Sequence, residues 1–285
     1  VFEVADDAPI GGSIGNILVK TPKSEKVQVK GGVWQNYDLV QSGNRGTFYE
    51  TWLDKISFAV VEKLPFKVHV EVPKTPIVRY GFRYLKIKVD REKGYDDPIR
   101  VTLLFKPPGI GSSSYITIPK GKTEGSYYIS ANGGAAIGDW KTTFLAEATV
   151  DGGRAWSSTD LFDFKIDDYF VSGKIPLVTT EQGKDCKIIC EVTHKTPFEG
   201  KATITLGGMP NGATTEPLEI TKDTKEIVFN VKVTDKARIG YNRNLFCDFK
   251  LKKDGEEIVH RFSYNGRFRI DAPQKLVAQA TTEKK

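Results

Sequence analysis

The sequence contains little of what helices and membrane spans are made from. Among its 285 residues there are one Met, four Trp and three Cys, against 27 Gly and 14 Pro. No window carries an apolar stripe with the 3.6-residue period of a helix, and none approaches the roughly 18 consecutive apolar residues of a membrane span. We therefore expect strands and turns rather than helices, and no membrane span.

The sequence also lacks the short motifs of the common enzyme classes. It has no His-Glu-x-x-His zinc motif, no Gly-x-Ser-x-Gly nucleophile elbow and no phosphate-binding loop. The three histidines, His69, His194 and His260, are scattered along the chain. No nucleophile, base and orienting group occur together in one segment, so we expect neither an enzyme nor a cofactor site.

Charge of one sign is never concentrated in a block. The 42 Lys and Arg exceed the 36 Asp and Glu, which gives a net charge of +6, but the two signs are interleaved, as in residues 86–93. A protein that follows a phosphate backbone usually has a basic patch. We expect a solvated surface of mixed charge without specific affinity for nucleic acid; weak attraction to anionic polymers or membrane surfaces is the alternative.

One pattern is present three times. An alternating run, a small polar turn and the sequence Ala-x-Ile-Gly occur at residues 8–11, 135–138 and 237–240, each followed by another alternating run. The last two copies are about 100 residues apart, and the matches between them extend over whole units. The first copy carries about 25 additional residues before its closing run, at about 21–51.

Each complete unit contains some seven alternating strands separated by turn signals every 8 to 12 residues, which is typical of an immunoglobulin-like sandwich. The predicted fold is therefore all-β, with tandem immunoglobulin-like β-sandwich domains of which the first is incomplete; a closed barrel is the structural alternative. The domains are expected at 1–64 (the C-terminal half of a unit, with the insertion), 65–169 and 170–271, followed by a flexible tail at 272–285.

The repeated Ala-x-Ile-Gly has a structural interpretation. A small Ala fits where the chain crosses between sheets, the Ile fills the core at that corner, and the Gly permits a positive φ. The alternative is calcium, because paired carboxylates such as Asp167 and Asp168 lie near the edges of the units. Calcium needs several converging oxygens, so its predicted site is the junction at Asp167 and Asp168.

All three cysteines lie in the last unit. Cys190 and Cys247 fall on inward positions of an early and a late strand, which face each other across an immunoglobulin-type core. A disulfide between them would stabilise the fold by about 4 kcal/mol on the entropic model. The alternative is that all three are small buried apolar residues, and Cys186 would in any case be left over.

The insertion in the first unit is the predicted binding site. Trp34, Tyr37, Tyr49 and Trp52 occur among Asn, Gln and Gly, a composition found in sugar-stacking platforms and in protein hot spots. The alternative is that these rings pack on their own hairpin and bury its underside.

The second unit resembles a bacterial family. The linked segments 118–125 (Ile-Pro-Lys-Gly-Lys-Thr-Glu-Gly), 135–140 (Ala-Ala-Ile-Gly-Asp-Trp), 148–153 (Ala-Thr-Val-Asp-Gly-Gly) and 156–158 (Trp-Ser-Ser) are similar to the Ig-like repeats of large secreted proteins of planctomycete type, often found beside pre-peptidase C-terminal modules. The resemblance implies an exported, extracellular or cell-envelope protein in which such units are spacers or interaction modules, and it implies no catalytic residues.

The sequence begins at Val1 without a Met or a recognisable signal peptide, so we expect a mature chain or part of a larger protein. Its expected function is that of a non-catalytic spacer and adhesion module, with other domains or subunits of an envelope assembly as partners. Two alternatives remain. One is a carbohydrate-binding accessory region of a secreted hydrolase, with polysaccharide as partner. The other is a subunit of a surface fibre or lattice that is completed by donated strands.

Overall fold

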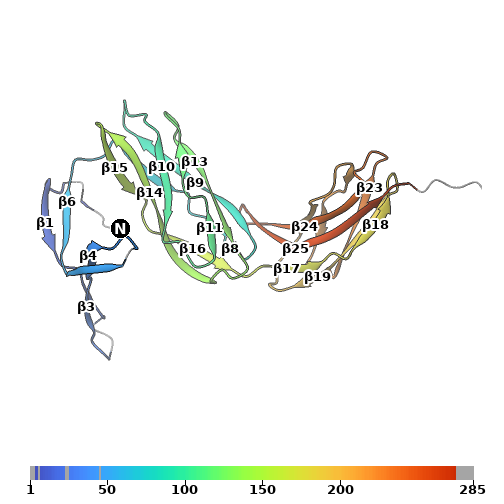
Figure 1. Ribbon diagram of the computed structural model, residues 1–285, viewed down its shortest axis with the longest axis horizontal. Helices are drawn as coiled ribbons and strands as arrows, with labels where there is room; N and C mark the ends of the chain where they lie inside the picture. Colours follow the sequence, from blue (N-terminus) through green and yellow to red (C-terminus); the bar gives the residue numbers. More distant parts are fainter. Residues whose placement is uncertain (1–3, 6, 23–25, 45, 274–285) are drawn as a thin grey trace, which may run out of the picture. The chain divides into compact units, whose positions relative to one another are not determined.

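The computed structural model is all-β, and it describes residues 4–5, 7–22, 26–44 and 46–273 (Figure 1). These residues form strands, turns and loops, without any helix that is long and apolar enough to cross a membrane. The chain divides into two compact units, Val1–Leu64 and Pro65–Lys285. The predicted all-β fold with β-sandwich domains is confirmed.

The first unit consists of three two-stranded antiparallel sheets, β1-β6, β2-β3 and β4-β5. Their strands are β1 (Gly11–Gly15), β2 (Leu18–Lys20), β3 (Lys30–Gly32), β4 (Gln35–Gln41), β5 (Thr47–Leu53) and β6 (Ile56–Val60). None of the described residues of this unit is buried. It therefore has paired strands but, within the described residues, no core of its own.

The second unit contains two sandwiches. In the first sandwich, a four-stranded sheet β11-β13-β9-β7 faces a sheet of order β12-β10-β14-β16-β8, to which β15 is added through β14. The strands are β7 (Phe66–Val70), β8 (Ile77–Val78), β9 (Phe82–Arg91), β10 (Ile99–Leu104), β11 (Ile110–Ser112), β12 (Ile116–Ile118), β13 (Glu124–Ala131), β14 (Gly138–Val150), β15 (Gly153–Ser158) and β16 (Phe162–Asp167). Alternate residues of β9 are buried, as a sheet with one face in the core requires.

The second sandwich repeats this plan. A sheet β17-β19-β23-β21 faces a sheet β18-β25-β24-β20-β22. The strands are β17 (Val171–Lys174), β18 (Val178–Glu181), β19 (Cys186–His194), β20 (Ala202–Gly207), β21 (Ala213–Thr214), β22 (Leu218–Ile220), β23 (Glu226–Val233), β24 (Gly240–Lys253) and β25 (Glu256–Asp271). Its core is built from alternate residues of both sheets, with Phe229, Phe249 and Phe268 fully buried.

The opening strand of each sandwich changes sheets. β7 pairs with β9 in one sheet, and β8 pairs in parallel with β16 in the other; β17 and β18 do the same with β19 and β25. Prolines at 73, 76 and 176 lie in the two connections. Because proline lacks an N–H and cannot continue a ladder, it favours a break at these points.

The closing strand of each sandwich is interrupted halfway. In the first sandwich β15 and β16 are separated by residues 159–161. In the second, β25 runs through but shifts register between its pairs with Leu245 and Cys247, and Ser263 and Asn265 have φ values of 56° and 67°. Residues 263–265 therefore bulge out of the sheet.

The repeated Ala-x-Ile-Gly forms a corner against a second, distant loop. Ala135 and Ala237 are buried, and the backbones of Gly109 and Gly212 approach them so closely that a Cβ on these glycines would lie 2.4 and 2.5 Å from the alanine Cα. Gly138 and Gly240 have φ values of 146° and 124°. The small Ala and the positive φ agree with the prediction.

The prediction for the Ile of this motif is wrong. Ile137 and Ile239 are 48% and 49% exposed, so neither fills the core. The reason is that residues 135–137 and 237–239 precede β14 and β24 and are not in a strand, so the two-residue period that would keep the Ile on the same side as the Ala does not apply to them.

Candidate interaction surface at the junction of the two sandwiches

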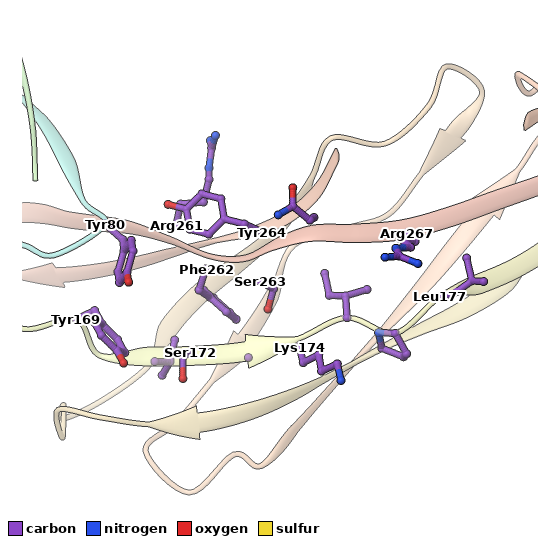
Figure 2. Close-up of a pocket in the computed structure, with 15 residues that line it drawn as sticks. Tyr80, Tyr169, Ser172, Lys174, Leu177, Arg261, Phe262, Ser263, Tyr264 and Arg267 are labelled. Carbon is purple, nitrogen blue, oxygen red and sulfur yellow. The ribbon is translucent and has the colours of Figure 1, made fainter. Parts of the chain in front are cut away.

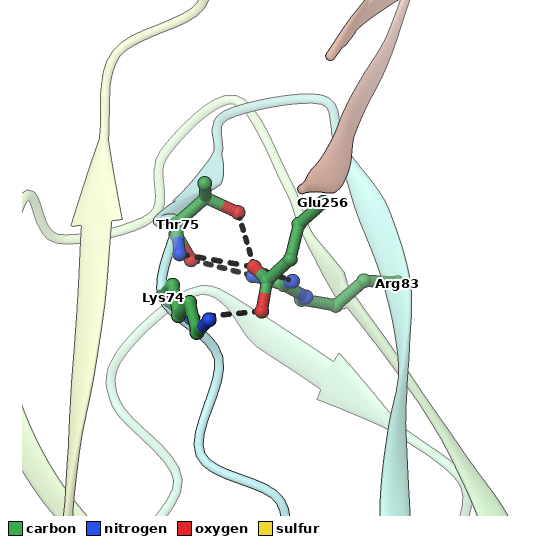
Figure 3. Close-up of polar contacts among 4 residues, drawn as sticks. All are labelled: Lys74, Thr75, Arg83 and Glu256. Atoms are coloured by element: carbon green, nitrogen blue, oxygen red, sulfur yellow. Dashed lines mark hydrogen bonds and ion pairs between the residues drawn. The ribbon is translucent and has the colours of Figure 1, made fainter. Parts of the chain in front are cut away.

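The two sandwiches of the second unit are joined by a carboxylate. Glu256 is the first residue of β25, directly after the turn at Asp254 and Gly255. Its side chain accepts hydrogen bonds from the backbone N–H of Lys74 (2.9 Å), the N–H and hydroxyl of Thr75 (3.0 and 2.6 Å) and Nη2 of Arg83 (2.9 Å), as Figure 3 shows. We call these four residues the junction clamp.

The clamp holds its carboxylate in the charged form. Burial alone would raise the pKa of Glu256, but the hydrogen bonds from Thr75, Lys74 and Arg83 outweigh it and lower the pKa to about 2. Arg83 also donates from Nη1 to the carbonyl oxygen of Thr75 at 2.5 Å, which fixes the guanidinium between the two acceptors. Charge-assisted bonds of this kind are about twice as strong as neutral ones.

A backbone contact lies beside the clamp. Gly81 forms an isolated antiparallel bridge with His260, and the N–H of Arg261 donates to the carbonyl oxygen of Tyr80 at 3.0 Å. A Cβ on Gly81 would lie 2.6 Å from the carbonyl oxygens of both Val78 and Val259. Only glycine lets the strand of the second sandwich come this near.

His260 is completely buried at this contact. Its ring stacks on Phe249 with centroids 4.7 Å apart, and Nε2 accepts from the N–H groups of Phe170 and Val171 at 3.3 and 3.5 Å. Burial lowers the pKa of His260 to about 3, so the imidazole is neutral at physiological pH.

A groove of about 720 Å³ opens next to the junction. Figure 2 shows β25 along one side and β17 along the other, with Tyr80 and Tyr169 at one end and Leu177 and Arg267 toward the other. We call this cavity the junction groove. It is lined by Tyr80, Tyr169, residues 171–177, residues 261–265 and Arg267.

The groove carries positive charge and aromatic rings. None of its lining residues is acidic, and three are cationic. Arg261 is neutralised by Asp248, to which Nε and Nη2 donate at 2.7 and 3.0 Å. Among the described residues Lys174 and Arg267 have no ion-pair partner, and both side chains are exposed. The groove therefore offers two available cations.

The four rings of the predicted binding site are all exposed. Trp34, Tyr37, Tyr49 and Trp52 expose 59%, 48%, 69% and 58% of their surface. In the β4–β5 register Tyr37 lies opposite Thr51, whereas Trp52 lies opposite Asn36, so these two rings occupy opposite faces of the hairpin. No ring contact joins any two of the four, and they do not form a single platform.

Cys190 and Cys247 lie together in the core of the second sandwich. Both are fully buried free thiols, and Cys186 is a partly buried free thiol. The main cause of the raised pKa of Cys247 is a hydrogen bond between the two thiols, and burial is the second cause. The same hydrogen bond lowers the pKa of Cys190. The Sγ of Cys190 also lies 3.4 Å from Oγ of Ser263, so this thiol lies directly beneath the groove.

The carboxylates proposed for calcium each face a cation instead. Asp168 lies 3.7 Å from Nη1 of Arg79, and Asp167 lies 3.6 Å from Nζ of Lys165. Across the part of the chain that the structure describes, no group of three or more His, Cys, Asp or Glu residues is arranged to hold a metal ion.

Sequence reasoning missed the junction clamp and the groove. Glu256 is separated from Thr75 and Arg83 by more than 170 positions, and nothing local distinguishes it from other acidic residues after a turn. One signal was available for the groove. When the two complete units are aligned, residues 159–161 and 263–265 occupy the same place, between alternating runs of their closing strands.

No protein-family model and no curated protein matches the sequence. Among solved structures, the chain is similar to a protein of unknown function from Porphyromonas gingivalis W83, with 11% identity, coverage of 74% of this chain and 100% of that one, and a TM-score of 0.25. It is also similar to fibronectin(III)-like modules of CbhA from Clostridium thermocellum, with 12% identity, 72% and 94% coverage, and a TM-score of 0.23. The fold assignment rests on the strand pairing described above.

Proposed function

We propose that this chain is a non-catalytic segment of an exported or cell-envelope protein, in which the two sandwiches serve as a spacer and as a module for protein interaction. The junction clamp is the observation that carries the proposal. A spacer must keep a defined direction from one domain to the next, and most domain junctions within a chain move unless their interface is large or well bonded. Four hydrogen bonds to one carboxylate, beside a backbone bridge, supply such a connection.

The proposal predicts that the two sandwiches tumble as one body and that Glu256→Gln separates their motions. The substitution removes the charge from all four hydrogen bonds and leaves Arg83 without its counter-ion, which is expected to cost roughly 1–3 kcal/mol. Residual dipolar couplings of the full chain measure this directly. Couplings from both sandwiches should fit a single alignment tensor in the parent and two different tensors in the variant.

Glu219→Gln is the matched control, because Glu219 forms an exposed ion pair with Lys201 inside the second sandwich at 2.6 Å. Exposed pairs contribute little, so one tensor should still describe this variant. If the parent chain already needs two tensors, the sandwiches are independently mobile and the spacer function fails.

A second candidate function is that of an assembly subunit whose first unit is completed by strands from a neighbouring copy. The observation in its favour is that none of the described residues of Val1–Leu64 is buried. Even the apolar side chains Leu18, Val19 and Phe48 are more than half exposed. Such apolar surface is normally covered. Light scattering should show association that increases with concentration. Hydrogen exchange of the associated form should show protection of the amides of β4 and β5. A monomer at every concentration would count against strand exchange.

A further inference from the structure

We propose that the junction groove binds an extended acidic peptide segment of a partner protein, which adds a strand to the open edge of β25. This inference rests on the proposed interaction function and names the surface and the chemistry of the partner. Peptide recognition by strand addition takes its affinity from main-chain hydrogen bonds and its specificity from the side chains beside them.

The edge of β25 is available in the middle and closed at both ends. On the side away from β24, His260 and Arg261 contact Gly81 and Tyr80, and Phe268–Asp271 pairs with β18. Between these contacts, among the described residues, no strand pairs with that edge. The opposite wall, β17, is the edge strand of its own sheet, where it pairs with β19 and with no other strand of the described part of the chain. Unpaired strand edges are templates for another strand.

The shape of the groove fits an extended chain. Its two walls are formed by residues 171–177 on one side and by residues 261–265 with Arg267 on the other, and both run along the groove. The bulge at residues 263–265 displaces β25 from the ladder, with Ser263 and Asn265 held in left-handed conformations. Non-glycine residues adopt this conformation at a cost, and such strain gathers at binding sites.

The charge of the groove selects the partner. Lys174 and Arg267 are exposed cations without an ion pair in the described part of the chain, and no acidic residue lines the walls. Three tyrosines close one end: the ring of Tyr80 lies 5.5 Å from that of Tyr169 and 6.0 Å from that of Tyr264. An alternating acidic and apolar peptide would place carboxylates by the cations and an apolar side chain on the rings.

The equivalent place in the first sandwich is built differently. A smaller cavity of about 280 Å³ lies between residues 69–72 and residues 159–163, and its walls contain Asp160 and Asp163. Thr159 ties the break in the closing strand to Thr143 through hydrogen bonds at 2.7 and 3.1 Å. The same position is therefore smaller and acidic there, so we expect the peptide to bind only in the second sandwich.

The test is an amide-resolved NMR titration of the full chain with the synthetic peptide acetyl-Glu-Val-Glu-Tyr-Glu-Val-amide at low ionic strength. Amides of β17 and of residues 262–267 should shift, and those of residues 159–163 should not. The double variant with Lys174→Glu and Arg267→Glu should bind at least tenfold more weakly, whereas Lys187→Glu, an exposed lysine on β19, should bind like the parent.

Three further peptides separate strand addition from simple charge attraction. Two peptides of the same sequence carry N-methyl groups on one or the other set of alternate amides, and one of them should lose binding, because successive N–H groups of a strand point to opposite edges. A peptide with Lys in place of Glu should also lose binding. Unchanged binding by both N-methylated peptides, equal binding by the double variant, or shifts outside the groove would each overturn the proposal. If peptide binding fails while the dipolar couplings of the parent still fit one tensor, the groove proposal is wrong and the spacer proposal stands.

Discussion

Two ionisable residues at the junction are held in opposite states by their surroundings. Glu256 stays charged because four donors surround its carboxylate, and its pKa is lowered to about 2. His260, a few residues further along β25, is surrounded by Phe rings and stays neutral with a pKa of about 3. In both cases the folded state disfavours the protonated form. Lowering the pH therefore decreases the free energy of unfolding through both residues, over two different pH ranges.

The pH dependence of stability should reflect His260 first. Its folded pKa lies below the value of about 6.5 in the unfolded chain, so its contribution is complete above pH 6.5 and is lost as the pH falls toward 3. By pH 5 the loss should reach about 2 kcal/mol. The contribution of Glu256 is complete above its unfolded pKa of about 4.3 and disappears as the pH falls toward 2.

Urea unfolding of the parent and of His260→Gln between pH 7.5 and pH 5 measures this effect. The glutamine keeps a polar group near the N–H groups of Phe170 and Val171 but does not titrate. The free energy of unfolding of the parent should decrease as the pH falls across this range, whereas that of the variant should change little. Parallel slopes would show that groups other than His260 cause the loss.

At the residue scale, prediction from sequence succeeded where the relevant partner is implied by the strand pattern. The inward positions of Cys190 and Cys247 follow from alternation in two strands that face each other, and the structure places both thiols in the core. The partners of Glu256 follow from no such pattern. They depend on how two complete sandwiches pack against each other, and local periodicity does not predict such a contact.

At the scale of elements, the repeated corner owes its form to a contact between loops. Ala237 packs on the backbone of Gly212, the N–H of Thr234 donates to the carbonyl oxygen of Gly212 at 2.9 Å, and the N–H of Arg238 donates to that of Asn211 at 2.9 Å. The sequence shows both loops, but it does not show that they touch. That contact explains why the corner keeps an Ala rather than a larger apolar residue.

Two glycine substitutions isolate this contact. Gly212 and Gly255 have nearly the same φ, 84° and 80°, but a Cβ on Gly212 would lie 2.5 Å from Cα of Ala237, whereas a Cβ on Gly255 would meet nothing within 4 Å. Gly255→Ala should cost about 1 kcal/mol for the backbone conformation alone. Gly212→Ala should cost at least about 2 kcal/mol more, because backbone atoms must move apart.

Chemical denaturation of both variants under the same conditions gives this difference. Similar losses for the two would mean that the corner can relax around a methyl group, and that close packing does not explain the small residue there.

At the scale of the whole molecule, the parts that were predictable are those with a local period. Alternating apolar residues and turn signals define the strands of both sandwiches, and the alignment of the two units anticipates that they share one plan. The same reasoning does not apply to the first unit. Its strands pair only two at a time, with no facing sheet among the described residues to cover the apolar side chains.

The split opening strands have a mechanical consequence. In each sandwich a strand near the point where the chain enters lies parallel to the strand by which it leaves: β8 beside β16, and β18 beside β25. Tension applied along the chain therefore pulls such a pair lengthwise, in shear, and its hydrogen bonds must fail together rather than one after another. Four residue pairs resist in the second sandwich, from Val178↔Phe268 to Glu181↔Asp271, and two in the first, Ile77↔Ile166 and Val78↔Asp167. Under load the first sandwich should yield before the second.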